Sequence, residues 1–293
     1  MILGDNMRVK AQRFDPRQSM NNKKFEVFHY KDTNPSDGEL HHHDFYEVCC
    51  FLGGEVDYLV DGRMYRLDPG DLLLINPMEL HRHVLNTEST LYERIVIWIN
   101  AEYLKSFSDD SVNLTSCFDS SLPTHSNILR PNAAHRAQIM SLLGELVREN
   151  YSTDSGAGLS AYGIFLHFMS ELNRLSLSGR GYREKKEDSD LVTRVLAYIG
   201  ENYDKEISLE LLSQNFYVSK YHLSHEFSRE VGISVYRYIM LKRLLVARQL
   251  LSEGMTPNEA CVRCGFNDYT SFYRAFKTEY GTNPRACLMG LDR

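Results

Sequence analysis

A segment that occurs twice constrains the fold of this chain more than any other feature. The sequence SLELLSQNFYVSKYHLSHEFSREVGIS begins at Ser208, and TPNEACVRCGFNDYTSFYRAFKTEYGTNP begins at Thr256. Four positions match at a constant offset of about 49 residues, with Leu223, Phe227, Glu230 and Gly232 recurring as Phe272, Phe276, Glu279 and Gly281. Internal repetition of this kind predicts two equivalent structural units.

Both copies carry the start and stop signals of two short helices. Thr256-Pro257-Asn258-Glu259 has the pattern of a capping box, with proline at the first helical position, and Ser208 offers the same cap to the first copy. A second helix is predicted to begin near Ser219 or Asp268 and to end at Gly232 or Gly281, where glycine can adopt the left-handed conformation. Each copy is therefore predicted to form a helix, a turn and a second helix.

The second helix of each copy has an apolar face and a polar face. Leu223 and Phe227 lie four positions apart and share one side, as do Phe272 and Phe276. The opposite sides carry polar, aromatic and basic residues: Tyr221, His225 and Ser228 in the first copy, and Thr270, Arg274 and Lys277 in the second. Such helices suit the DNA major groove, where base edges are recognised by hydrogen bonds and apolar contacts. The alternative is an ordinary helical subdomain with a solvated face, and two copies in register favour DNA.

The segment from Ser234 to Gly254 connects the two copies and is predicted to be one unbroken helix. About 19 residues at ~1.5 Å each give a rod of roughly 28 Å. With the width of the flanking helices, this length suits two recognition helices spaced one duplex turn apart, about 34 Å.

These residues resemble the AraC/XylS family of transcription regulators over the C-terminal third of the chain. The shared positions are Arg243-Leu244, Ala247, Leu250-Leu251, Cys264-Gly265-Phe266, Phe272, Arg274, Phe276-Lys277, Gly281 and Pro284. The resemblance implies contacts to double-stranded DNA from Ser219, Lys220, Tyr221, Ser224 and His225 in the first copy, and from Asn267, Asp268, Tyr269, Thr270, Arg274 and Lys277 in the second. After Pro284, the chain lacks the aromatic-arginine pair common in the family.

Length and composition set broad limits. A chain of 293 residues with 43% hydrophobic residues is typical of two globular domains. No apolar run approaches 18 residues and the N-terminus lacks the apolar core of a signal peptide, so we expect a cytoplasmic protein without a membrane partner. The six scattered cysteines are interpreted as thiols.

The charge is unevenly distributed. The net charge is −6, but residues 191–290 hold 12 Lys and Arg against 10 Asp and Glu, a net of +2 that leaves −8 for the rest. Phosphate attraction depends on local patches rather than on the total charge. A single chain should therefore bind DNA weakly, and we expect a homodimer to add affinity.

The N-terminal half predicts a β-barrel. Residues 1–24 are interpreted as a flexible arm, and short runs rich in aromatic and β-branched residues follow from Phe25 to about Asn100. Asp61-Gly62 between apolar runs is a strong hairpin signal, and many short, evenly spaced strands indicate a sandwich or a barrel. The predicted fold class is α+β multidomain: a cupin-like barrel followed by two helices, then an all-α domain with two helix-turn-helix motifs.

The segment GELHHHDFYEVCCFLGG and the later run from Pro77 to His81 resemble the two cupin motifs. His41, His43, Glu47 and His81 match the positions that hold metal in cupin enzymes, although the spacing after Pro77 is one residue short. His41, His43 and Glu47 have the same parity, so in a strand they would point the same way. Three interpretations are open: an effector pocket without metal, a site for divalent Mn, Fe, Ni or Zn, and structural polar residues. His42 and His83 are interpreted as surface residues and Trp98 as core.

From Pro131 the apolar period lengthens to that of helices, over Ile139 to Val147 and over Leu159 to Leu172. Two helices after a cupin barrel resemble the family's dimerisation elements, and they would also cover one barrel face. The predicted domains are an effector-binding and dimerisation domain at 25–177, a solvated linker at 178–190 and a DNA-binding domain at 191–293.

The sequence thus predicts a DNA-binding transcription activator that is not an enzyme. Its barrel is expected to bind a small molecule, with the family resemblance favouring a sugar or related metabolite, and its action is expected to include contact with RNA polymerase. No cofactor is required by this prediction. The alternatives are a metal-dependent cupin enzyme fused to a DNA-binding tail and a regulator whose barrel only dimerises.

Overall fold

The computed structural model describes residues 19–77, 79–85, 91–108, 113–120, 122, 125–178 and 191–289. Two compact units divide the chain, residues 1–60 with 64–186 and residues 61–63 with 187–293. Residues 1–18 of the predicted arm and 179–190 of the predicted linker lie outside the described residues.

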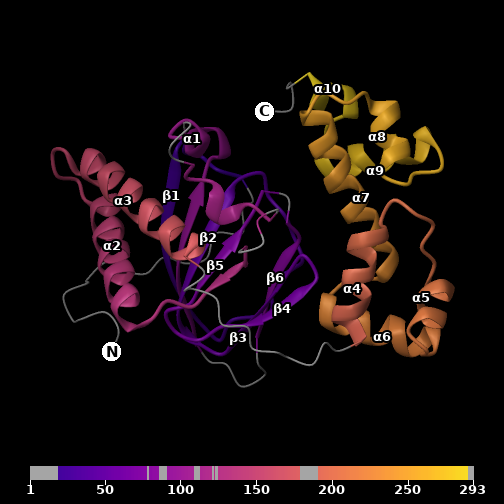
Figure 1. Ribbon diagram of the computed structural model, residues 1–293, viewed down its shortest axis with the longest axis horizontal. Helices are drawn as coiled ribbons and strands as arrows, with labels where there is room; N and C mark the ends of the chain where they lie inside the picture. The colour runs from indigo at the N-terminus through magenta and orange to yellow at the C-terminus, as the bar shows by residue number, and fades with distance from the viewer. Residues whose placement is uncertain are drawn as a thin grey trace. The chain divides into compact units, whose positions relative to one another are not determined.

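Two antiparallel sheets form the first unit (Figure 1). The larger sheet has the strand order β1 (Phe25–Thr33), β7 (Leu91–Ile99), β2 (Tyr46–Gly54), β5 (Leu72–Ile75), β8 (Ile128–Leu129). The smaller sheet has the order β4 (Arg63–Arg66), β3 (Val56–Val60), β6 (His81–Leu85). Asp61 and Gly62 connect β3 to β4 with φ of 42° and 91°, the positive values that a two-residue hairpin turn needs, so the predicted hairpin is confirmed.

The larger sheet is covered on both faces, which explains the continuous apolar runs in its strands. One face of β2 places Cys49 and Phe51 in a core together with Tyr58 and Tyr92 inside the barrel. The other face of the sheet belongs to a second core, which also contains Phe165 and residues of two long helices. These are α2 (Ala133–Tyr151) and α3 (Ala157–Leu177), which lie beside the sheet in Figure 1. The short α1 (Ala101–Lys105) and the turn η1 (Ser116–Phe118) complete the unit.

The second unit is all helical. It contains α4 (Leu191–Asn202), α5 (Leu209–Asn215), α6 (Lys220–Val231), α7 (Val235–Ser252), α8 (Pro257–Arg263), α9 (Tyr269–Tyr280) and α10 (Pro284–Leu288). Each copy of the repeated sequence forms the predicted helix, turn and helix, and α7 is the predicted unbroken connector.

The helix boundaries follow the sequence signals. The side chains of Ser208, Ser219, Thr256 and Asp268 each accept a hydrogen bond from the backbone N–H three residues later. Thr256 and Glu259 form the predicted capping box. Gly232 and Gly281 end α6 and α9 in the left-handed conformation, as predicted. None of the described helices is both long enough and apolar enough to cross a bilayer.

Candidate nucleic-acid interface and effector site

The turns before α6 and α9 have the same backbone geometry. Tyr217 and Gly265 occupy equivalent positions with φ of 57° and 77°. The N–H of Val218 donates to the carbonyl of Ser213 at 3.0 Å, and the N–H of Phe266 donates to that of Cys261 at 3.1 Å. The sequence duplication is therefore a structural duplication, and α6 and α9 are presented in the same way.

Helix α6 exposes an aromatic and polar surface. The Tyr221 side chain is 80% exposed, and its ring stacks on that of His225 with centroids 6.1 Å apart and planes 21° apart. These residues line a surface hollow of about 430 Å³ together with Ser224, Ser228 and Arg229. Leu223 and Phe227 are fully buried behind this surface, as the apolar periodicity predicts.

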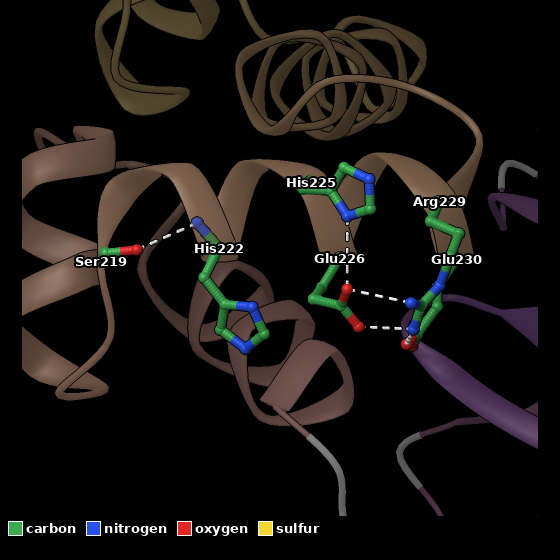
Figure 2. A network of polar contacts seen from close by, with 6 residues as sticks. All are labelled: Ser219, His222, His225, Glu226, Arg229 and Glu230. Carbon is green, nitrogen blue, oxygen red and sulfur yellow. Dashed lines mark hydrogen bonds and ion pairs between the residues drawn. The ribbon is translucent and has the colours of Figure 1, made fainter.

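The charged side chains of α6 form a network within the helix, which Figure 2 shows. Arg229 donates to both carboxylate oxygens of Glu226, with Nη1 at 2.9 Å from Oε1, and its Nη2 lies 3.1 Å from Oε1 of Glu230. His225 Nδ1 lies 3.3 Å from the same Glu226 carboxylate. Lys220 pairs with Glu210 of α5. The cations of this helix are thus already matched by nearby carboxylates.

Helix α9 presents its cations differently. Thr270, Arg274 and Lys277 are exposed, and among the described residues neither Arg274 nor Lys277 has an ion-pair partner. Ala275 occupies the position equivalent to Glu226, so the carboxylate that binds Arg229 in α6 has no counterpart in α9. Both cations are available for phosphate or guanine contacts.

The structure places the predicted DNA-binding residues at the start and on the outer side of α6 and α9. All of them are exposed except Ser224, which is half-buried: Ser219, Lys220, Tyr221, His225, Asn267, Asp268, Tyr269, Thr270, Arg274 and Lys277. Ser219 and Asp268 use a side-chain oxygen as the helix N-cap. Of the remaining side chains, Lys220 and His225 contact Glu210 and Glu226, whereas Arg274 and Lys277 have no ion-pair partner among the described residues.

In the first unit, three of the four predicted effector residues meet at one point, but not for the predicted reason. The parity argument required His41, His43 and Glu47 to lie in a single strand. That is wrong, because β2 begins at Tyr46 and both histidines precede it. His41 is instead placed by backbone hydrogen bonds with His81, at 3.0 Å and 2.9 Å. Ligand atoms of His43, Glu47 and His81 all lie within 4.8 Å of one another.

The histidine rings are oriented by backbone carbonyls. Nδ1 of His41, His43 and His81 donates to the carbonyl oxygens of Glu39, Phe45 and Glu79 at 2.8, 2.9 and 2.9 Å. A carbonyl oxygen only accepts, so each Nδ1 carries a proton and Nε2 is the ring nitrogen left for other contacts. The His43 ring is further held by stacking on Phe45, with centroids 3.9 Å apart.

Glu47 is also held in place. Trp98 Nε1 donates to its Oε2 at 2.9 Å, and His43 Nε2 lies 3.3 Å from the same oxygen. Burial alone would raise the pKa of Glu47, but the interactions with His43, His41 and Trp98 lower it below its ordinary value. Burial also lowers the pKa of His41 and places that of His81 well below its ordinary value. The site therefore combines the Glu47 carboxylate with the rings of His41 and His81, whose neutral forms burial favours.

His83 corrects a second sequence interpretation. It is half-buried rather than a surface residue, and its ring lies 5.2 Å from the Tyr92 ring. Burial and the nearby Arg94 lower its pKa to about 4. His42 is also half-buried, whereas Trp98 is buried as predicted.

Comparison with protein families identifies both units. Residues 22–169, half of the chain, match the AraC-like ligand binding domain, and residues 212–289 match a helix-turn-helix domain. The chain belongs to the AraC family. This AraC-family protein joins a ligand-binding domain and a DNA-binding domain in one chain, which confirms the predicted fold class and family.

Individual relatives resemble this AraC-family protein over most of its length. It is 25% identical over 254 residues to the HTH-type transcriptional activator RhaS of Salmonella arizonae, covering 86% of this chain and 88% of that protein. ToxT from Vibrio cholerae, solved with an unsaturated fatty acid, is 13% identical over 92% of this chain and 97% of that chain, with a TM-score of 0.40. The C-terminal domain of the response regulator yesN from Fusobacterium nucleatum is 28% identical over 32% of this chain and 94% of that chain, with a TM-score of 0.32.

Several residues at the two sites of this AraC-family protein were missed from sequence. Glu226 and Arg229 are three apart on one helix, a spacing that predicts an ion pair and could have identified the network. Glu210 and Trp98 act through contacts with Lys220 and Glu47 that no local pattern signals.

Proposed function

We propose that this AraC-family protein is a sequence-specific transcription activator whose barrel binds a sugar or related metabolite. DNA binding is supported by the pair of equivalent helices α6 and α9, each of which has a buried aromatic or aliphatic row and an exposed polar side. The name of the relative RhaS supports activation rather than repression.

Direct base contacts are assigned to exposed side chains of both helices. Arg274 has the reach and the free donors for a guanine edge, and Lys277 suits a phosphate. Tyr221 and His225 form a stacked pair that can contact a thymine methyl group or a base edge. Flanking positions on the same sides are the exposed Lys220, Asn267, Tyr269 and Thr270 and the half-buried Ser224.

The effector is assigned to the cluster of His41, His43, Glu47 and His81. Imidazole lone pairs and a carboxylate accept hydrogen bonds from hydroxyl groups, and the adjoining rings of Phe45 and Trp98 give an apolar wall. A polyhydroxylated ligand can donate hydrogen bonds from its hydroxyl groups to these acceptors and pack its carbon atoms against the apolar wall. Ligand binding would change the populations of domain arrangements and thereby DNA affinity.

The protein is further proposed to act in the cytoplasm as a homodimer that contacts RNA polymerase. Helix α3 exposes Leu159 to 76%, an apolar side chain available to a second copy. Dimerisation would supply the affinity that a weakly basic DNA-binding unit lacks.

The proposal is tested by selecting DNA from a random duplex library with the full-length protein at low salt. Enrichment of one sequence with two half-sites is expected. A monosaccharide panel is then screened for a sugar that raises the melting temperature of the protein, and that sugar is expected to change the affinity of the protein for the enriched sequence. Uniform recovery of all sequences would contradict sequence-specific binding. Enrichment without a response to any sugar would contradict the effector class alone.

A further inference from the structure

The buried cluster in the barrel contains a nitrogen with no hydrogen-bond partner. His81 is 1% exposed, and among the described residues its Nε2 has no hydrogen-bonding partner. Its Nδ1 proton is already donated to the Glu79 carbonyl. A buried acceptor without a donor costs about 1 to 3 kcal/mol, and such exceptions in native structures call for an explanation.

The neighbouring groups cannot supply the missing donor. His43 Nε2 and Glu47 Oε2 are both acceptors in the neutral-imidazole state and lie 3.3 Å apart. A proton on His43 Nε2 would satisfy that pair, but it would leave His81 Nε2 unpaired. Trp98 Nε1, a donor, already points at Glu47. The cluster therefore has more hydrogen-bond acceptors than donors at this point.

A cation satisfies this arrangement. Ligand atoms of His43, Glu47 and His81 lie within 4.8 Å of one another, close enough to bind one ion, and all three residues are buried. Each is oriented by a further hydrogen bond, from His43 to the Phe45 carbonyl, from His81 to the Glu79 carbonyl and to Glu47 from Trp98. Carbonyl and aromatic N–H partners of this kind are what orient the ligands of protein metal sites.

We propose that His43, Glu47 and His81 bind one divalent first-row transition-metal ion. Two imidazoles and one carboxylate suit Zn²⁺, Fe²⁺, Mn²⁺ or Ni²⁺ and leave positions for further ligands. His41 is outside the three-residue set, although its ring lies 4.1 Å from that of His81. The site is thus a three-residue set with His41 beside it, rather than the four-residue set predicted from sequence.

The ion deepens the proposed effector site, since hydroxyl or carboxylate oxygens of a metabolite can complete its coordination. Only this link to sensing depends on the proposed function. Binding of the ion itself depends on the three side chains alone, so the two ideas can fail separately.

Metal content and metal affinity test the inference directly. Full-length protein without a histidine tag, purified without chelator, is expected to carry close to one transition-metal ion per chain by elemental mass spectrometry. After removal of metal by a chelator, calorimetric titration with Zn²⁺ and absorption spectra with Co²⁺ are expected to show one site. Glu47→Gln and His81→Gln should each weaken the affinity by at least about tenfold.

His83→Gln is the matched control, because it removes an imidazole from the same strand outside the three-residue set and should leave metal affinity unchanged. Melting temperatures of the metal-free variants separate loss of binding from loss of folding. Trp98→Phe retains every ligand, keeps an aromatic ring against Phe28 and Phe45 and removes the hydrogen bond to Glu47, so it should give a smaller loss of affinity.

Equal metal binding by the wild type, Glu47→Gln and His81→Gln, or no binding above a stoichiometry of one tenth in the wild type, would overturn the inference. A sugar that stabilises the chelator-treated protein would then leave the proposed function intact. Metal binding that depends on Glu47 and His81, in a protein whose DNA affinity responds to no sugar and no chelator, would support the ion and contradict the sensor.

Discussion

The two helix-turn-helix copies have the same backbone conformation in the turn but differ in the contacts made at equivalent positions. Tyr217 and Gly265 adopt the same left-handed turn, yet Tyr217 is 94% exposed, whereas a Cβ at Gly265 would lie 2.5 Å from the backbone oxygen of Asp204. The loop that contains Asp204 is held by Arg243 of α7, which donates to the carbonyls of Tyr203 and Lys205 at 2.7 Å each. Glycine is therefore required only where the two halves of the domain meet.

The recognition helices differ in charge as well. In α6 the carboxylate of Glu226 is occupied by Arg229 and His225. In α9 the equivalent residue is Ala275, and Arg274 and Lys277 have no ion-pair partner among the described residues. Phosphate binding by α6 must compete with internal ion pairs, whereas Arg274 and Lys277 of α9 have no ion pair to break among the described residues. We therefore expect the second copy to supply more of the electrostatic affinity for DNA than the first.

The largest expected effect is on stability, at Gly265. Gly265→Ala adds left-handed strain of about 1 to 2 kcal/mol and a contact that forces the loop at Asp204 to move, for a total loss of about 3 kcal/mol in the free energy of unfolding. Urea denaturation of the isolated residues 187–293 or of the full chain measures it. Gly254→Ala is the control, because that glycine also has positive φ but nothing within 4 Å of an added Cβ. Equal losses at both glycines would show that the loop contact is unimportant.

The next effect is on DNA affinity, at Arg274. Arg274→Ala should weaken binding to the selected sequence by about 1 to 3 kcal/mol and relax the preference at one or two base pairs. The equivalent change in the first copy, His225→Ala, should cost less, because that side chain is shared with Glu226. Fluorescence anisotropy with single-base variants of the DNA site measures the loss of affinity and of base preference for both protein variants. An equal loss on every sequence would make Arg274 a phosphate contact instead.

A smaller effect is expected from exchanging the residues that differ between the copies. Glu226→Ala should remove the two-oxygen partner of Arg229 and leave only its contact with Glu230, and so raise DNA affinity by up to roughly 1 kcal/mol and steepen the salt dependence by at most about one released ion. Ala275→Glu should do the reverse by placing a carboxylate beside Arg274, as Glu226 lies beside His225. Affinities measured across a series of salt concentrations test both. If Glu226→Ala lowers affinity, Glu226 contacts the DNA itself, as a carboxylate can with cytosine.

Local sequence signals predicted most of the helical unit, because its boundaries depend on nearby residues. Ser219, Thr256, Asp268 and Gly281 each act within one helical turn, and each was predicted correctly. The barrel site was harder to predict because His81 comes from a different sheet than Glu47. The parity of His41 and His43 did not apply, since neither lies in a strand, and only the pairing of distant segments brings the ligands together.

The smallest expected effect is at Tyr217, and it separates backbone strain from function. A non-glycine residue in the left-handed region costs about 1 kcal/mol, partly offset by the greater entropy that glycine loses on folding. Tyr217→Gly should therefore change stability by no more than about +0.5 to +1 kcal/mol, in the direction of greater stability, in contrast to the loss at Gly265→Ala. If the exposed ring also contacts DNA, Tyr217→Gly will lower DNA affinity while raising the melting temperature. Tyr217→Asn tolerates the same backbone angle, so an affinity loss shared by Asn and Gly would assign it to the missing ring rather than to a changed turn.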